Sequence, residues 1–182
     1  GDPASRVACE TYATVDQLHI MGEITSKTHV NYEDIARRVI RDIGYTEPGH
    51  GFDADSCRID VSVHHQSPDI AMGVDNKDPL ESGAGDQGMM FGYACRETDH
   101  YMPLPIELSH KLTRRLETVR RSGLLPFLLP DGKSQVTVEY KDGKPARITA
   151  VVLSSQHEDS ISTEELRRAL YEQVLMPVLP QD

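Results

Sequence analysis

The sequence has few cysteines, and they are not arranged in any pattern that would define a disulfide framework or a metal site. Cys9, Cys57 and Cys95 are odd in number, lie far apart and form no C-x-x-C pair. A disulfide framework needs pairs and a zinc site needs closely spaced ligands, so neither is indicated. Buried free thiols in the core are the expected state of all three.

Long apolar runs and blocks of basic residues are also missing. No stretch approaches the roughly 20 apolar residues that cross a bilayer, and residues 1–5 lack the basic start of a signal peptide. A cytoplasmic location with no membrane partner is therefore expected. The formal net charge of −10 repels a nucleic-acid backbone, and no basic cluster with interleaved aromatic residues offsets it, so nucleic acid is not an expected partner.

The first third of the chain reads as a mixture of strands and helix. Apolar alternation predicts strands over residues 6–13 and 18–25, joined as a hairpin by the turn 14–17. A helix follows Asn31, a capping residue with Asp34 three positions on, and ends at Gly44. Alternation over residues 57–64 predicts a further half-buried strand.

The rest of the chain begins with a stretch that has no period of either kind, residues 66–82. Such a long connection predicts a lid that is also a domain boundary. The apolar run 89–95 is expected to be a buried strand, and a helix is expected over 106–121. Residues 136–140 and 148–153 predict a second hairpin through Asp142-Gly143, followed by a helix from Ser162 that ends at Pro177.

An internal repeat is visible in this order of elements. An offset of 131 positions carries Asn31 onto Ser162 and the first hairpin onto residues 137–156. Hairpin followed by helix therefore occurs twice. Two copies of one α/β unit of the α+β type, each an antiparallel or mixed sheet covered by a helical layer, would bury the apolar helix faces.

One glycine-rich hexapeptide, Gly83-Ala84-Gly85-Asp86-Gln87-Gly88, has the composition of a tight wall around a ligand. Its spacing satisfies G-x-G-x-x-G, the dinucleotide fingerprint, which should leave a buried strand and open a helix. Residues 78–82 do not read as a strand, and 89–95 read as a strand and not a helix. A nicotinamide oxidoreductase is therefore kept only as an alternative.

The same hexapeptide, followed by an apolar-Phe-Gly-Tyr-Ala run, closely resembles the signature of S-adenosylmethionine synthetases (methionine adenosyltransferases). Matching motifs occur in the family's order: G-E-I-T at 22–25, G-F-D at 51–53, Q-S-P-D-I at 66–70, P-D-G-K-S-Q at 130–135 and V-V-L-S-S-Q-H at 151–157. The resemblance implies a pseudo-symmetric fold of similar α/β domains. Residues 1–65 would belong to the N-terminal domain, 66–82 to a flexible gating loop and linker, and 83–182 to the central domain.

The resemblance also implies an activity. The methionine sulfur attacks the 5′ carbon of ATP and expels triphosphate, which is then hydrolysed to pyrophosphate and phosphate, with Mg²⁺ and K⁺ as cofactors. A thioether has no proton to lose, so no general base is needed for the attack. The substrates would be ATP and L-methionine, and the sites would form between subunits of a homodimer or homotetramer.

The resemblance assigns roles residue by residue. Glu23, Gln66 and Asp86 would bind methionine, the turn Asp131-Gly132-Lys133 would bind ATP, and Glu10 would bind potassium. No catalytic residue is assigned. The gating loop would consist of Gln66, Ser67, Pro68, Asp69, Ile70, Ala71, Met72, Gly73, Val74, Asp75 and Asn76.

Simpler explanations exist for most of these residues. Glu10 and Glu23 could be solvated strand positions, and Asp86 could stabilise a turn through its own side chain. The tripeptide Asp142-Gly143-Lys144 repeats the proposed ATP motif at a position that a hairpin turn explains fully. The eight histidines lack the spacing or clustering of a metal site.

Two motifs of the family pattern are absent from the sequence. The His-Pro-Asp-Lys motif should precede Gly1, and the glycine-rich GGGAFSGKD region should follow Asp182. Their absence predicts a fragment that does not synthesise S-adenosylmethionine by itself. A non-catalytic interaction module is therefore a third hypothesis beside the synthetase and the oxidoreductase.

Overall fold

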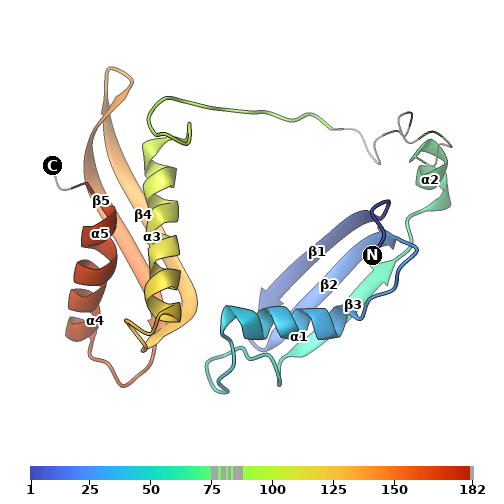
Figure 1. The fold of residues 1–182 in the computed structure, drawn as a ribbon, viewed down its shortest axis with the longest axis horizontal. Helices are drawn as coiled ribbons and strands as arrows, with labels where there is room; N and C mark the ends of the chain where they lie inside the picture. Colours follow the sequence, from blue (N-terminus) through green and yellow to red (C-terminus); the bar gives the residue numbers. More distant parts are fainter. Residues whose placement is uncertain (75–77, 79–80, 82, 84–87, 181–182) are drawn as a thin grey trace. The chain divides into compact units, whose positions relative to one another are not determined.

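The computed structural model describes residues 1–74, 78, 81, 83 and 88–180 (Figure 1). The chain divides into two compact units, Gly1–Phe91 and Gly92–Asp182. Both are mixed α/β structures, as the sequence predicts. Each unit has its own hydrophobic core and is described by itself.

A three-stranded sheet forms the first unit. Strands β1 (Arg6–Thr14) and β2 (Gln17–Thr25) pair as the predicted antiparallel hairpin, and β3 (Arg58–His64) pairs parallel to β2. A parallel pair needs a crossover connection, and helix α1 (Tyr32–Ile43) supplies it. The predicted first hairpin, helix and strand are confirmed.

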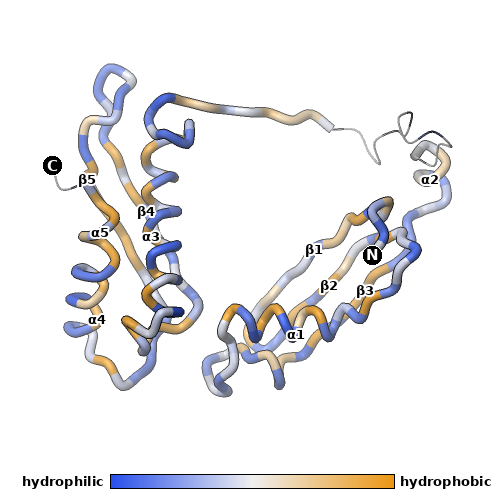
Figure 2. The backbone as a smooth tube through the Cα atoms, in the orientation of Figure 1, coloured by the Kyte–Doolittle hydropathy of each residue, from blue (hydrophilic) through white to orange (hydrophobic). Residues whose placement is uncertain are grey.

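Helix α1 begins and ends at the predicted residues. The Asn31 side chain accepts a hydrogen bond from the Asp34 backbone N–H at 3.2 Å, and Gly44 ends the helix in the left-handed conformation at φ 114°. Hydrophilic and hydrophobic positions alternate along the helix (Figure 2). Its apolar side packs on one face of the sheet, in a core made of Leu18, Ile20, Ala36, Ile40, Ala54 and Cys57.

The second unit places helices on one face of a long hairpin. Its elements are α3 (Leu104–Arg121), β4 (Leu128–Lys141), β5 (Lys144–His157), α4 (Thr163–Leu170), the π-helix η2 (Tyr171–Leu175) and α5 (Met176–Val178). Figure 1 shows α3 and α4 lying along the β4–β5 hairpin. The core joins all of these layers through Leu108, Leu112, Leu116, Val119, Leu125, Leu128, Val136, Leu166, Leu170 and Val174.

The predicted buried strand over 89–95 is wrong. Residues 88–95 form neither strand nor helix, and the side chains of Met90 and Phe91 are 93% and 89% exposed. A single extended segment is not stable without a neighbouring strand, and within the described part of the chain none pairs with it. The helix that a dinucleotide fingerprint requires after Gly88 is also absent there, so the oxidoreductase alternative loses its structural support.

Other boundaries differ from the sequence predictions. The stretch 66–82, expected to be irregular, contains the short helix α2 (Pro68–Val74). The helical stretch that begins at Thr163 continues through η2 and α5 and ends at Val178, one residue beyond the predicted Pro177.

The internal repeat holds in order but not at one constant offset. The two hairpin turns are related by an offset of 126, from Asp16 to Asp142, both at positive φ, whereas the helix caps are related by 131. The longer second hairpin accounts for the difference. Of the cysteines, Cys57 is buried as expected, but Cys9 and Cys95 are only half-buried.

Candidate functional site

The sheet of the first unit has one face that α1 does not cover, here named the open face. Residues paired in register lie on the same face, so the open face carries every second residue of each strand. All of its side chains are exposed or half-buried. They are Arg6, Ala8, Glu10, Tyr12 and Thr14 of β1, Gln17, His19, Met21, Glu23 and Thr25 of β2, and Arg58, Asp60, Ser62 and His64 of β3.

Two of the predicted site residues, Glu10 and Glu23, lie near each other on the open face. Glu10 pairs with Met21 and Glu23 pairs with Ala8, which makes the two glutamates diagonal neighbours, about 7 Å apart by ordinary strand geometry. His64 is the partner of Glu23 on the other side. Neither carboxylate has a hydrogen-bond or ion-pair partner among the described residues, so both remain available to a positively charged ligand.

Gln66, the third predicted methionine-binding residue, lies two positions beyond the end of β3. Its amide oxygen accepts a hydrogen bond from Arg6 Nε at 3.1 Å, which ties the start of the predicted gating loop to β1. The structure therefore brings Gln66 to the sheet that carries Glu10 and Glu23. Sequence reasoning missed Arg6, and no local pattern indicates it.

The other end of the open face carries a carboxylate that is already paired. Asp60 accepts hydrogen bonds from Gln17 Nε2 at 2.8 Å and from Arg58 Nε at 3.0 Å, and His19 Nε2 lies 3.7 Å from it. The Gln17 bond is the largest cause of the lowered pKa of Asp60. The Asp60 carboxylate is therefore paired with other side chains of the sheet, whereas those of Glu10 and Glu23 have no such partner among the described residues.

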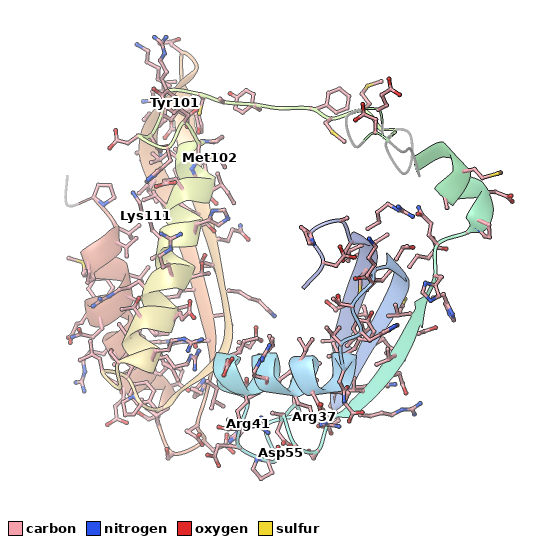
Figure 3. The ribbon with its side chains drawn as sticks, turned by 45° about the vertical axis from the view of Figure 1, so that its right-hand side comes forward. Arg37, Arg41, Asp55, Tyr101, Met102 and Lys111 are labelled. Atoms are coloured by element: carbon pink, nitrogen blue, oxygen red, sulfur yellow. The ribbon has the colours of Figure 1, made fainter. Side chains whose placement is uncertain are left out.

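The G-F-D motif has a structural role. Asp53 is buried and accepts hydrogen bonds from the backbone N–H of Asp55 at 2.7 Å and of Ser56 at 3.1 Å, and from the Ser56 hydroxyl. These bonds, the Ser56 hydroxyl first, lower its pKa. Arg37 of α1 donates to the Ala54 carbonyl at 2.8 Å, and Figure 3 shows Arg37 and Arg41 beside Asp55. The motif positions the loop that leads into β3.

The predicted ATP-binding tripeptide lies in a strand, so the predicted turn is wrong. Gly132 and Lys133 of β4 pair with Ser155 and Ser154 of β5. A Cβ added at Gly132 would lie 3.1 Å from Leu116 Cδ1, so Gly132 faces the helices. Asp131 and Lys133 are exposed, with Lys133 Nζ 4.0 Å from Asp131 Oδ2. Asp-Gly favours turns, but here the chain stays in the strand: residues 129–131 have no register partner, and pairing with β5 resumes at Gly132.

Three predicted residues lie outside the described residues. Asp86 of the hexapeptide and Asp75 and Asn76 of the gating loop are not described, so their roles stay predictions. Glu10, Glu23 and Gln66 belong to the first unit, whereas Asp131, Gly132 and Lys133 belong to the second. That these groups contribute to one substrate site is a prediction.

Glu97 caps α3, a contact that the sequence analysis missed. Pro103, at the N-cap position of α3, makes no side-chain capping bond; instead Glu97 accepts from the Leu104 backbone N–H at 2.8 Å. The same Glu97 oxygen accepts from the Tyr140 hydroxyl of β4 at 2.6 Å. This junction connects the start of α3 to the hairpin, and the Glu97 carboxylate raises the pKa of Tyr140 to about 12.

The Tyr140 junction predicts a distinct titration. An alkaline titration of phenolate absorbance should show one of the seven tyrosines ionising near pH 12. The folded pKa of Tyr140 lies above the usual 10.0. The stabilisation of the folded state by the Tyr140–Glu97 hydrogen bond is therefore complete below pH 10 and is lost as the pH rises towards 12. The late phase should disappear in Tyr140→Phe and move towards pH 10 in Glu97→Gln. A late phase that persists in Glu97→Gln would contradict the assignment.

Metal ligands do not gather in the part of the chain that the structure describes. No group of three histidine, cysteine, aspartate or glutamate side chains is placed to enclose an ion there. In the same residues, no helix combines the length and apolar composition needed to cross a membrane.

Comparison with known families matches both units. The N-terminal domain of S-adenosylmethionine synthetase matches residues 1–68, and the central domain of the same enzyme matches residues 81–182. These matches place the protein among the transferases. The chain belongs to the S-adenosylmethionine synthetase family, whose members are methionine adenosyltransferases and use metal ions.

Proposed function

We propose that this chain supplies the methionine-binding surface, and part of the ATP-binding surface, for the synthesis of S-adenosylmethionine. In the reaction, the sulfur of L-methionine attacks the 5′ carbon of ATP and triphosphate leaves, to be hydrolysed to pyrophosphate and phosphate. The family membership supports this reaction. A cytoplasmic location, expected from the sequence, is part of this proposal.

The observation that carries the proposal is the pair of unpaired carboxylates on the open face. Glu10 and Glu23 are held side by side by the register of β1 and β2, on a face that no helix of the described residues covers. The substrate brings an ammonium group, and its sulfur gains positive charge as the sulfonium forms. The Glu23 carboxylate is our candidate partner of the ammonium group, and Glu10, its diagonal neighbour, is kept as the candidate potassium ligand.

The nucleotide needs positive charge, which is scarce in a chain of net charge −10. Lys133, exposed on β4, is our candidate for a phosphate contact, with Asp131 beside it to orient its ammonium group. The predicted gating loop, which includes α2, would close over the substrates and exclude water. Asp86 would line the same site.

The family's metal ions fit this chain only in part. Hard cations prefer oxygen ligands, and the exposed Glu10 carboxylate on β1 can offer one ligand to K⁺. Because the described residues hold no group of three candidate ligands, further ligands for K⁺ and those for Mg²⁺ would come from other residues or a second subunit. A homodimer or homotetramer would provide such a partner. When bound, the ions would neutralise the phosphate charge.

Replacing the proposed ammonium ligand tests the function. Glu23→Gln keeps the shape of the side chain but removes its charge, so calorimetric titration should show L-methionine binding roughly tenfold weaker, about 1.4 kcal/mol. Glu47→Gln, the same change at an exposed position after α1, is the control and should bind like the unaltered chain. Equal affinity of Glu23→Gln and the unaltered chain, or no saturable binding by either, would contradict the proposal.

A further inference from the structure

Arg6 and Gln66 meet at one end of the open face although 60 positions separate them in the sequence. Arg6 pairs with Thr25, and Glu23 pairs with His64. Continuing the second register by two residues brings Gln66 opposite Thr25. The hydrogen bond from Arg6 Nε to Gln66 Oε1 therefore reaches across the end of β2, a span of two strand spacings or about 10 Å.

The chemistry of arginine determines how the Gln66 amide is oriented. A guanidinium group carries only donors, so the atom it meets at 3.1 Å must be the amide oxygen. The Gln66 Nε2–H₂ group then points away from Arg6. Within the described residues, nothing accepts a hydrogen bond from this nitrogen. Gln66 thus offers two N–H donors to a ligand, while its acceptor is occupied.

We propose that Arg6 is a positioning residue that makes Gln66 the ligand of the substrate carboxylate and so sets the direction in which the amino acid lies. This inference rests on the proposed function. A carboxylate only accepts hydrogen bonds and an ammonium group only donates them. The donor end of Gln66 suits the carboxylate, and the unpaired Glu23 carboxylate suits the ammonium group.

Two ligands that differ only at one end separate this role from a structural one. L-methioninol keeps the ammonium group and the thioether but has an alcohol in place of the carboxylate. Arg6→Met keeps most of the apolar stem and removes every donor. In calorimetric titrations it should weaken L-methionine binding roughly five- to tenfold and leave L-methioninol binding unchanged. Arg6→Lys, which keeps one donor and the charge, should restore part of the loss.

The matched control is Arg58→Met, the same change at the far end of the open face, where Arg58 contacts Asp60. It should leave the affinities for both ligands unchanged. A second readout needs no ligand: the Gln66 side-chain amide resonances of the unaltered chain should be distinct in NMR spectra. In Arg6→Met they should move to the positions of a free glutamine.

Each outcome decides the question. Equal weakening of both ligands in Arg6→Met, unchanged L-methionine affinity in that variant, or Gln66 resonances that do not respond to it would overturn the positioning role and leave the proposed function intact. If the unaltered chain bound neither ligand, the proposed function would fail and this inference with it. Circular dichroism spectra identical to those of the unaltered chain show that each variant folds.

Discussion

Gly22→Ala should destabilise the first unit by about 3 kcal/mol or more, a large part of the stability of a small domain. A Cβ added at Gly22 would lie 2.1 Å from the Ala8 carbonyl oxygen and 2.9 Å from Cys9 Cα, both backbone atoms of β1 that cannot move independently. The residue also has φ +143°, where side chains are rare. Overpacking and backbone strain each cost about 1–3 kcal/mol.

Gly51→Ala, in the same unit, separates these two costs. Gly51 also has positive φ, +81°, but an added Cβ would meet only Val15 Cγ1, at 3.9 Å. The free energy of unfolding of Gly51→Ala should fall by about 1–2 kcal/mol, the cost of backbone strain alone. Urea unfolding followed by circular dichroism measures both losses, and hydrogen exchange should show the Gly22→Ala loss in the β1–β2 amides. Equal losses in the two variants would show that the approach of β1 to Gly22 is not as close as described.

Leu112→Ala should destabilise the second unit by about 2–5 kcal/mol. Leu112 is fully buried in α3, in the core that joins this helix to the hairpin and to α4. Truncation leaves a cavity that the surrounding elements fill only in part. The loss should appear in urea unfolding and as faster hydrogen exchange along α3 and β4.

Ile106→Ala on the same helix is the matched control, because Ile106 is 38% exposed and lies outside the core cluster. The free energy of unfolding of Ile106→Ala should fall by less than about 1 kcal/mol, as expected for a partly exposed position away from the core. Similar losses at positions 106 and 112 would contradict the described orientation of α3.

Local patterns predicted most of the secondary structure. The apolar period and the caps predicted α1, with Asn31 and Gly44 at its ends, and the Ser162 capping box with Glu165 is present as expected. Asp142-Gly143 predicted the second hairpin turn. These features depend on residues within a few positions of one another, which is why the sequence alone contains them.

Features that depend on distant partners were not predictable in this way. Apolar composition suggested that residues 89–95 are buried, but a strand forms only beside a neighbour, which the sequence does not specify. The π-helix η2 likewise depends on packing between helices. Its Gln173 carbonyl accepts a hydrogen bond from Arg115 Nε of α3 at 2.8 Å. The Tyr140 bond to Glu97 spans 43 positions, and no motif marks it.

In the candidate site, too, motifs identified individual residues, and only the structure showed which of them lie together. The resemblance to the family, not the pattern of residues, selected Glu10, Glu23 and Gln66, since two carboxylates on strands are ordinary solvated positions. The strand register then supplied what motifs cannot: it placed both glutamates on one face, and the Arg6 bond brought Gln66 to the same sheet. For the tripeptide at Asp131, the motif misled, because Asp-Gly favours a turn and the structure has a strand.

The central claim is that the open face of the first sheet binds methionine, and its most direct test is an NMR titration of the ¹⁵N-labelled chain with L-methionine. The account predicts saturable shifts of the backbone amides of Gly22, Glu23 and His64 and of the Gln66 side chain, with the amides of α1 little affected. Shifts confined to other surfaces, or none at saturating methionine, would contradict it.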